Sequence, residues 1–167
     1  MAQYTSIKSQ IWSLDLIIAV FIFLGAMFIF YKYSINLSNI EQDNVANLIA
    51  DAKVISSYLV SEGYPPDWTT ANVTIIGLME KDQTLSKDKV IKFSQLAQID
   101  YEQTRSLFST KHDYFVFLEN KNGEKQNIDG IEWIGKNHST DNPDDIIKIY
   151  RFVYYNSTIL RLGLYVW

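Results

Sequence analysis

The chain has 167 residues, a formal net charge of −4 and no cysteine, which excludes a disulfide framework, a thiolate zinc site and a cysteine nucleophile. Its 15 basic residues are scattered and form no basic stripe, so we expect no nucleic-acid partner. Aromatic residues make up 14% of the chain, enough to build the core of one small domain.

The first third of the chain contains a long apolar segment. Residues 16–31 carry no charge, and with Ile11, Trp12 and Leu14 the segment approaches the roughly 20 residues that span about 30 Å of hydrocarbon. A small-residue cleavage site of the secretory type does not follow it, so we expect the segment to be retained. Because it is apolar on all sides, it must lie in lipid or in a bundle with copies of itself. The flanking charges favour a cytoplasmic N-terminus.

A helical pattern continues beyond this segment. Apolar residues recur at three- and four-residue steps, at Leu37, Val45, Leu48, Ala52, Ile55 and Leu59. No proline or glycine falls between Ala26 and Glu62, and Gly63 with Pro65-Pro66 forms a helix stop. We therefore expect a leader at 1–9 and one helix over 10–62, with a transmembrane half at about 11–31 and an amphipathic half at 32–62.

Asp15 lies near the start of the apolar segment, where an unpaired carboxylate costs several kcal/mol if it is fully desolvated. One interpretation places it at the membrane interface beside Trp12, in the aromatic belt. The other gives it a partner in a neighbouring molecule.

Four polar positions precede or interrupt the apolar run: Lys8, Gln10, Ser13 and Asp15. This pattern resembles the class III signal segment of archaeal type IV pilin-like proteins. The resemblance implies cleavage by a prepilin peptidase in the region Lys8, Ser9, Gln10 and Ile11. A cut after Ser9, where the family usually has glycine, makes Asp15 the sixth mature residue. A cut after Gln10 makes Asp15 the fifth, the family's usual position for its acid.

The resemblance further implies that Asp15 pairs with an amino group of another subunit during assembly. It implies as partners other copies of the chain or related pilins, membrane lipid before assembly, the prepilin peptidase and a pilus assembly platform.

The remainder, 63–167, is expected to form an extracytoplasmic α+β head. We predict a short strand near 73–78, a helix at 87–98 capped by Ser86 and another helix starting at Asp100. A strand at 114–119, an Asn-Gly turn and an apolar run at 128–134 predict one hairpin, and the runs 146–155 and 159–167 predict a second. The order of a long helix, short helices and an antiparallel sheet also resembles type IV pilins and pseudopilins.

No catalytic motif is present, and we expect neither an enzyme nor a cofactor. We interpret Lys111, His112 and Asp113 as a charged connection between a helix and a strand, not as a base with its orienting acid. Asp141, Asp144 and Asp145 are interpreted as a polar turn, because the glycine position of a calcium loop is Ile146. Calcium binding there stays an open alternative. The candidate glycosylation sites are the sequon residues Asn36, Asn72, Asn137 and Asn156.

These patterns predict a structural subunit, major or minor, of a type IV pilus-like surface filament. The alternative is a single-pass membrane protein that does not polymerise and whose head binds a ligand or partner.

Overall fold

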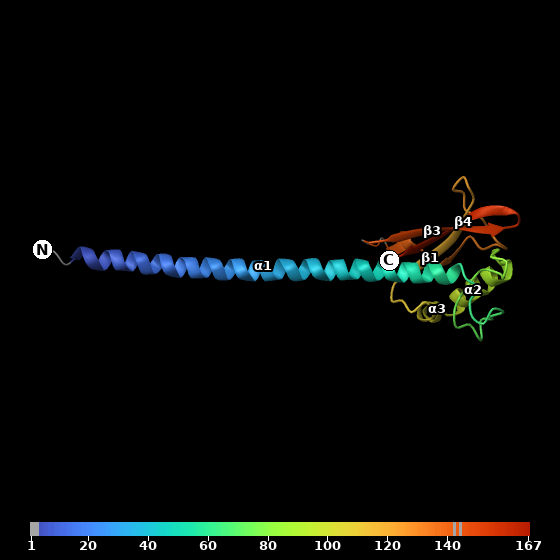
Figure 1. Cartoon of the computed structure of the whole chain (residues 1–167), viewed down its shortest axis with the longest axis horizontal. Coiled ribbons are helices and arrows are strands. Elements are labelled where there is room, and N and C mark those ends of the chain that lie inside the picture. The colour runs from blue at the N-terminus through green and yellow to red at the C-terminus, as the bar shows by residue number, and fades with distance from the viewer. Residues whose placement is uncertain (1–3, 142, 144) are drawn as a thin grey trace. The chain divides into compact units, whose positions relative to one another are not determined.

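The computed structural model describes the backbone of residues 4–141, 143 and 145–167, and the side chains of residues 14–34, 44–139, 143 and 145–167. The chain divides into two compact units, Met1–Asn44 and Val45–Trp167. Helix α1 (Tyr4–Leu59) runs through the first unit and ends inside the second (Figure 1). The remaining helices and all the strands belong to the second unit, which we call the head.

The last turns of α1 form one side of the core of the head. Leu48, Ala52, Ile55 and Leu59 are buried, at steps of four, three and four residues. This confirms the predicted apolar positions from Leu48 to Leu59, whereas Val45 is only half-buried and the side chain of Leu37 lies outside the described residues. The helix ends at Leu59, whose carbonyl accepts a hydrogen bond from the backbone N–H of Leu78 at 3.1 Å. A returning segment thus satisfies a carbonyl that the helix end leaves free.

The strand predicted near 73–78 does not form a regular ladder, and that prediction is wrong. The segment makes isolated bridges, including one between Tyr64 and Ile75. The reason is a close backbone crossing, since a Cβ on Gly77 would lie 2.2 Å from the backbone nitrogen of Gly63. Trp68 is fully buried beside this crossing and donates a 2.9 Å hydrogen bond from Nε1 to the Gly77 carbonyl.

Two short helices follow, as predicted. In α2 (Lys87–Ile99), the Ser86 side chain accepts a hydrogen bond from the Lys89 backbone N–H. In α3 (Tyr101–Leu107), the Asp100 carboxylate accepts one from the Gln103 N–H at 2.9 Å. Both N-caps satisfy an N–H group that the first turn of a helix leaves without a partner.

The sheet contains β1 (Tyr114–Glu119), β2 (Trp133–Gly135), β3 (Ile147–Tyr155) and β4 (Thr158–Val166) in the order β2-β1-β4-β3. Each neighbouring pair is antiparallel. The head is therefore α+β with a four-stranded antiparallel sheet, which confirms the predicted fold class. The second hairpin forms with its turn at Asn156 and Ser157. In Figure 1 the strands lie on one side of the last turns of α1, and α2 and α3 lie on the other.

The predicted strand at 128–134 is reduced to the three residues of β2. Residues 128 and 131 bridge each other across a tight turn, in which Asp129 and Gly130 have positive φ values of 56° and 87°. The first half of the apolar run therefore forms this turn, and only its last residues belong to a strand. A short helix, α4 (His138–Asp141), follows β2.

The two faces of the sheet differ in what covers them. The inner face carries the core residues Tyr114, Val116, Leu118, Ile134, Val153, Leu160, Leu162, Leu164 and Val166. Tyr114 packs against Phe93 of α2 and against Phe108, at ring centroid distances of 6.0 and 5.3 Å. Because side chains alternate along a strand, the residues between these form an outer face that points away from the core.

Candidate functional site

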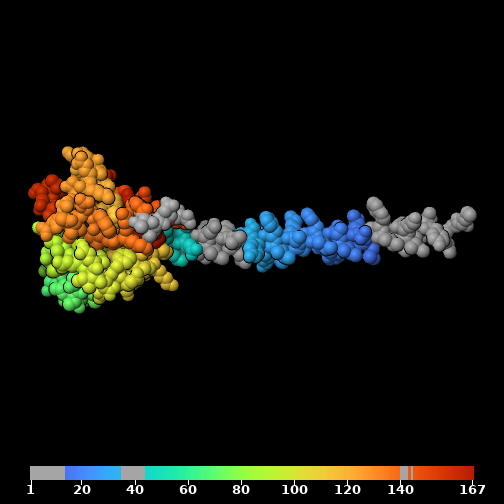
Figure 2. Space-filling view, turned by 180° about the vertical axis from the view of Figure 1, so that it is seen from behind, coloured from blue at the N-terminus to red at the C-terminus, as the bar shows by residue number. Residues whose placement is uncertain are grey.

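The apolar segment of α1 is the most prominent surface feature of the first unit. Residues Leu14–Ser34 have a mean hydropathy of 2.5, and none of the segment is buried. Figure 2 shows its side chains uncovered on the face drawn. The 21 residues of this segment extend about 32 Å at 1.5 Å per residue, which matches a hydrocarbon core of about 30 Å. By length and composition the segment can span a membrane, although a signal sequence passes the same test.

Exposure of this segment to water is energetically costly. Phe21, Phe28 and Phe30 are 72%, 63% and 74% exposed, and the leucines and isoleucines among them are similarly open. Full burial of such a side chain contributes about 1.5–3 kcal/mol. With this many exposed side chains, the gain on transfer into lipid or into a helix bundle is of the order of tens of kcal/mol.

Asp15 occupies the second position of the segment and is exposed between Leu14 and Leu16. Within residues 14–34 no ion pair or hydrogen bond joins its carboxylate to another side chain. The peptidase region Lys8, Ser9, Gln10 and Ile11 is helical in α1, but its side chains lie outside the described residues. Processing there therefore stays a prediction.

His112 lies in the connection between α3 and β1, as expected, but its partner differs from the one considered in the sequence. Its Nδ1 atom lies 2.9 Å from Oδ2 of Asp51, on α1, so the imidazole is paired with Asp51 and not with Asp113. Thr110 donates to the same carboxylate oxygen at 2.6 Å. Because the hydroxyl bonds the carboxylate and not the imidazole, the three groups do not form a nucleophile and base pair.

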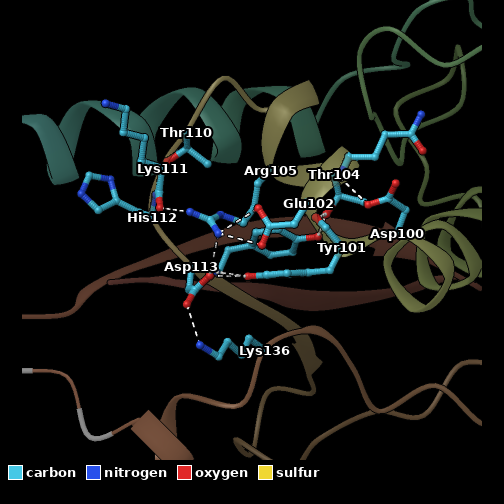
Figure 3. A network of polar contacts seen from close by, with 12 residues as sticks. Asp100, Tyr101, Glu102, Thr104, Arg105, Thr110, Lys111, His112, Asp113 and Lys136 are labelled. Atoms are coloured by element: carbon cyan, nitrogen blue, oxygen red, sulfur yellow. Dashed lines mark hydrogen bonds and ion pairs between the residues drawn. The ribbon is translucent and has the colours of Figure 1, made fainter.

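Asp113 is the centre of a separate polar network (Figure 3). Its carboxylate accepts from Lys136 Nζ at 2.9 Å and from the Tyr101 hydroxyl at 3.2 Å, and it lies 3.6 Å from Arg105 Nη1. The Tyr101 hydroxyl in turn accepts from the backbone N–H of Tyr114 at 3.1 Å. These contacts tie the beginning of β1 to α3, so their evident role is to hold the fold.

The tyrosines of this network are held in their neutral form. Burial raises the pKa of the Tyr101 phenol, and burial also raises the pKa of Tyr114. A neutral phenol can donate one hydrogen bond and accept others. The Tyr101 hydroxyl donates to Asp113 and accepts from the Tyr114 backbone N–H, and the Tyr114 hydroxyl shares one hydrogen bond with the Thr104 hydroxyl. Neither is poised to act as a base near neutral pH.

The outer face of the sheet is rich in aromatic rings: Phe115, Phe117, Trp133, Tyr150, Phe152, Tyr154 and Tyr165. Cationic side chains lie on several of them. Lys125 Nζ is 5.3 Å from the centre of the Phe115 ring, and Lys148 Nζ is 4.8 Å from that of Tyr165. Such cation–π contacts contribute about 0.5–1 kcal/mol at exposed sites. The two lysines place charged groups over rings of the two central strands, β1 and β4.

The sequence did not predict this clustering, because the rings come from four strands. Phe117 fits on the outer face only because its neighbour on β4 is Gly163, where a Cβ would lie 2.4 Å from the ring. Tyr150 and Tyr165 share a 2.8 Å hydrogen bond between their hydroxyls. Burial and, after it, this hydrogen bond raise the pKa of Tyr165.

Three of the four sequon asparagines lie in the head on its surface. Asn72, Asn137 and Asn156 are exposed. Asn36 falls within α1, and its side chain is outside the described residues. The structure thus leaves three accessible candidates for glycosylation.

The acidic run at 141–145 cannot be assessed as a calcium site, because the side chains of Asp141 and Asp144 are outside the described residues. Among the residues that are described, no group of three His, Cys, Asp or Glu side chains is placed to hold a metal ion.

Comparisons with models of protein families, with curated proteins and with solved structures find no match. The likeness to pilins therefore depends on the residues of the chain itself: the polar positions before the apolar segment, the segment and the order of elements behind it.

Proposed function

We propose that this protein is a structural subunit, major or minor, of a type IV pilus-like filament. The subunit is held in the membrane by the apolar part of α1 before assembly, with its N-terminus in the cytoplasm and its head outside. In the filament the same segment packs against copies of itself or against related pilins. The prepilin peptidase and an assembly platform are its partners in that process.

The observation that supports this proposal most directly is the exposed segment Leu14–Ser34 on a helix that continues into the head. A segment apolar on every side needs lipid or a bundle of helices around it. The same helix is buried in the head at Ala52, Ile55 and Leu59. One helix thus carries both a surface for assembly and the attachment of a folded domain.

Asp15 sets the register of assembly in this proposal. A carboxylate inside an apolar bundle is strongly disfavoured unless a cation pairs with it. Pairing with the amino group of a neighbouring subunit removes that penalty only at one axial offset between helices. The apolar contacts then supply the cohesion, and the charge pair selects the register.

The test compares three variants in the native host. Asp15→Ala and Asp15→Asn both remove the charge, and Asp67→Ala removes an exposed acid in the head as a matched control. We expect both Asp15 variants to reach the membrane but to disappear from the sheared extracellular fraction, while Asp67→Ala behaves as wild type. Normal incorporation of Asp15→Ala into filaments contradicts the register mechanism.

Two further readouts address the rest of the proposal. Recovery of the wild-type protein only with membranes favours the anchored protein that does not polymerise. Mass spectrometry of the mature N-terminus is expected to find Gln10 or Ile11 as the first residue, which identifies peptidase processing directly.

A further inference from the structure

The hairpin of β3 and β4 ends in a tight turn that carries a sequon, Asn156-Ser157-Thr158. Asn156 and Ser157 have φ values of 46° and 62°, between the paired residues Tyr155 and Thr158. Two successive positive φ values in a two-residue loop are typical of a type I′ turn, in which asparagine is favoured at the first position. The asparagine thus lies at the tip of the hairpin and is exposed.

The three described sequons differ in whether the acceptor side chain is engaged. Asn72 Oδ1 accepts from the backbone N–H and the hydroxyl of Thr69, at 2.7 and 3.0 Å. Asn137 Oδ1 accepts from the N–H of Ser139, a residue of its own sequon, at 3.1 Å. Across the described part of the chain, the side-chain amide of Asn156 has no hydrogen-bond partner. Its presentation to a transferase breaks no existing side-chain contact.

Beside this turn the outer face carries an apolar patch, made of Phe152, Tyr154 and Ile159, which we call the hairpin patch. These side chains are 78%, 47% and 63% exposed. Tyr154 and Ile159 are directly opposite each other, and Phe152 lies two residues before Tyr154 on β3. Tyr154 and Phe152 precede Asn156 by two and four residues, which places them about 7 and 14 Å from it along the strand. A group attached to Asn156 that extends back along the hairpin therefore covers the patch.

We propose that Asn156 carries an N-linked glycan and that the first sugars of this glycan pack on the hairpin patch. The faces of a pyranose present C–H groups, which suit the negatively charged face of an aromatic ring. The proposal rests on the part of the proposed function that places the head outside the membrane. It explains why an exposed apolar patch lies beside the described sequon whose asparagine side chain makes no hydrogen bond.

The modification needs a lipid-phosphate-linked sugar donor and a transferase. A bond forms between Nδ2 of Asn156 and the anomeric carbon of the sugar, while the bond from that carbon to the phosphate oxygen of the donor breaks. The amide loses one proton, and the lipid phosphate leaves with the electron pair. The side-chain carbonyl is retained.

The test starts with peptide mass spectrometry of the protein purified from its native host. We expect a glycan mass on the Asn156 peptide of the wild type and of Thr158→Ser, which keeps the sequon. Thr158→Ala and Asn156→Gly remove the sequon and are expected to lose that mass. Asn156→Gly is the better folded control, because glycine accepts the positive φ at this turn position and Thr158 keeps its hydroxyl.

Contact with the patch has its own readout. Binding of a dye specific for exposed apolar surface is expected to be higher for Asn156→Gly than for wild type, and replacement of Phe152 by Ser in the same variant is expected to abolish that difference. Equal dye binding by glycosylated wild type and Asn156→Gly overturns the packing on the patch.

Protease treatment of intact cells separates failure of this inference from failure of the topology. If the head is digested from outside but the Asn156 peptide is unmodified, the inference is wrong and the proposed topology stands. The same conclusion follows if Asn72 or Asn137 is modified and Asn156 is not. If the head is protected and no sequon is modified, both the topology and the inference are overturned.

Discussion

Replacement of Ile55 by Ala tests whether the last turns of α1 belong to the core of the head. Ile55 is completely buried, so the change removes three carbon atoms from the core. At about 0.8 kcal/mol for each carbon, the lost transfer free energy is about 2.4 kcal/mol. The cavity left behind adds to this, and measured Ile→Ala changes in cores cost about 2–5 kcal/mol. We expect a loss of about 3–4 kcal/mol in the free energy of unfolding of the head.

The adjacent residue provides a matched control. Val54 is on the same turn but is 41% exposed, and its truncation to Ala removes only two carbon atoms. The expected cost of Val54→Ala is therefore about 1 kcal/mol or less. Backbone effects of the two changes are similar, because both replace a β-branched residue of a helix by Ala.

The assay is urea unfolding of the full chain in detergent micelles, followed by tryptophan fluorescence. Trp68 is fully buried in the head and reports its unfolding. With a slope of about 1–3 kcal/mol per molar urea, Ile55→Ala is expected to lower the midpoint by at least about 1 M. Equal midpoints for the two variants would refute the reasoning, because they would show that Ile55 is not buried in the stable core.

Three further predictions concern the head. Gly163→Ala is expected to lower the free energy of unfolding by about 1–3 kcal/mol in the same assay, because the new Cβ would lie 2.4 Å from the Phe117 ring. Gly25→Ala is the control: its Cβ would meet no atom within 4 Å, so the urea midpoint is expected to stay unchanged. Thr84→Val is expected to raise the pKa of Asp82 toward 3.8, as measured by NMR titration, because the Thr84 hydroxyl and N–H hold that pKa low. An unchanged pKa in Thr84→Val contradicts this cause. Because the pKa of Asp82 is lower in the folded state than in the unfolded state, its contribution to stability is present above the unfolded-state pKa and is lost as the pH falls through the folded-state pKa. Tyr101 and Tyr114 have folded-state pKa values raised above 10.0 by burial, so their contribution is complete below pH 10.0 and is lost as the pH rises. Phenolate absorbance is expected to show that these two tyrosines ionise only when circular dichroism reports unfolding, and ionisation in the folded head would disprove their burial.

Local sequence patterns determined several elements of this protein. The apolar segment, the buried face of α1, the caps Ser86 and Asp100, strand β1 and the terminal hairpin were all predicted. Each depends on interactions between residues close in sequence: helical or strand periodicity, a capping side chain or a tight turn. The polar positions before the apolar segment likewise suggested the pilin-like function, which remains a proposal.

Contacts between distant segments decided the rest. The close crossing of Gly63 and Gly77 replaced a predicted strand by isolated bridges, and the partner of His112 proved to be Asp51, 61 residues away. The aromatic outer face and the hairpin patch exist only because strand register places residues of different strands side by side. Periodicity identifies which side of an element is apolar, but the register and the packing that select its partner depend on the whole chain.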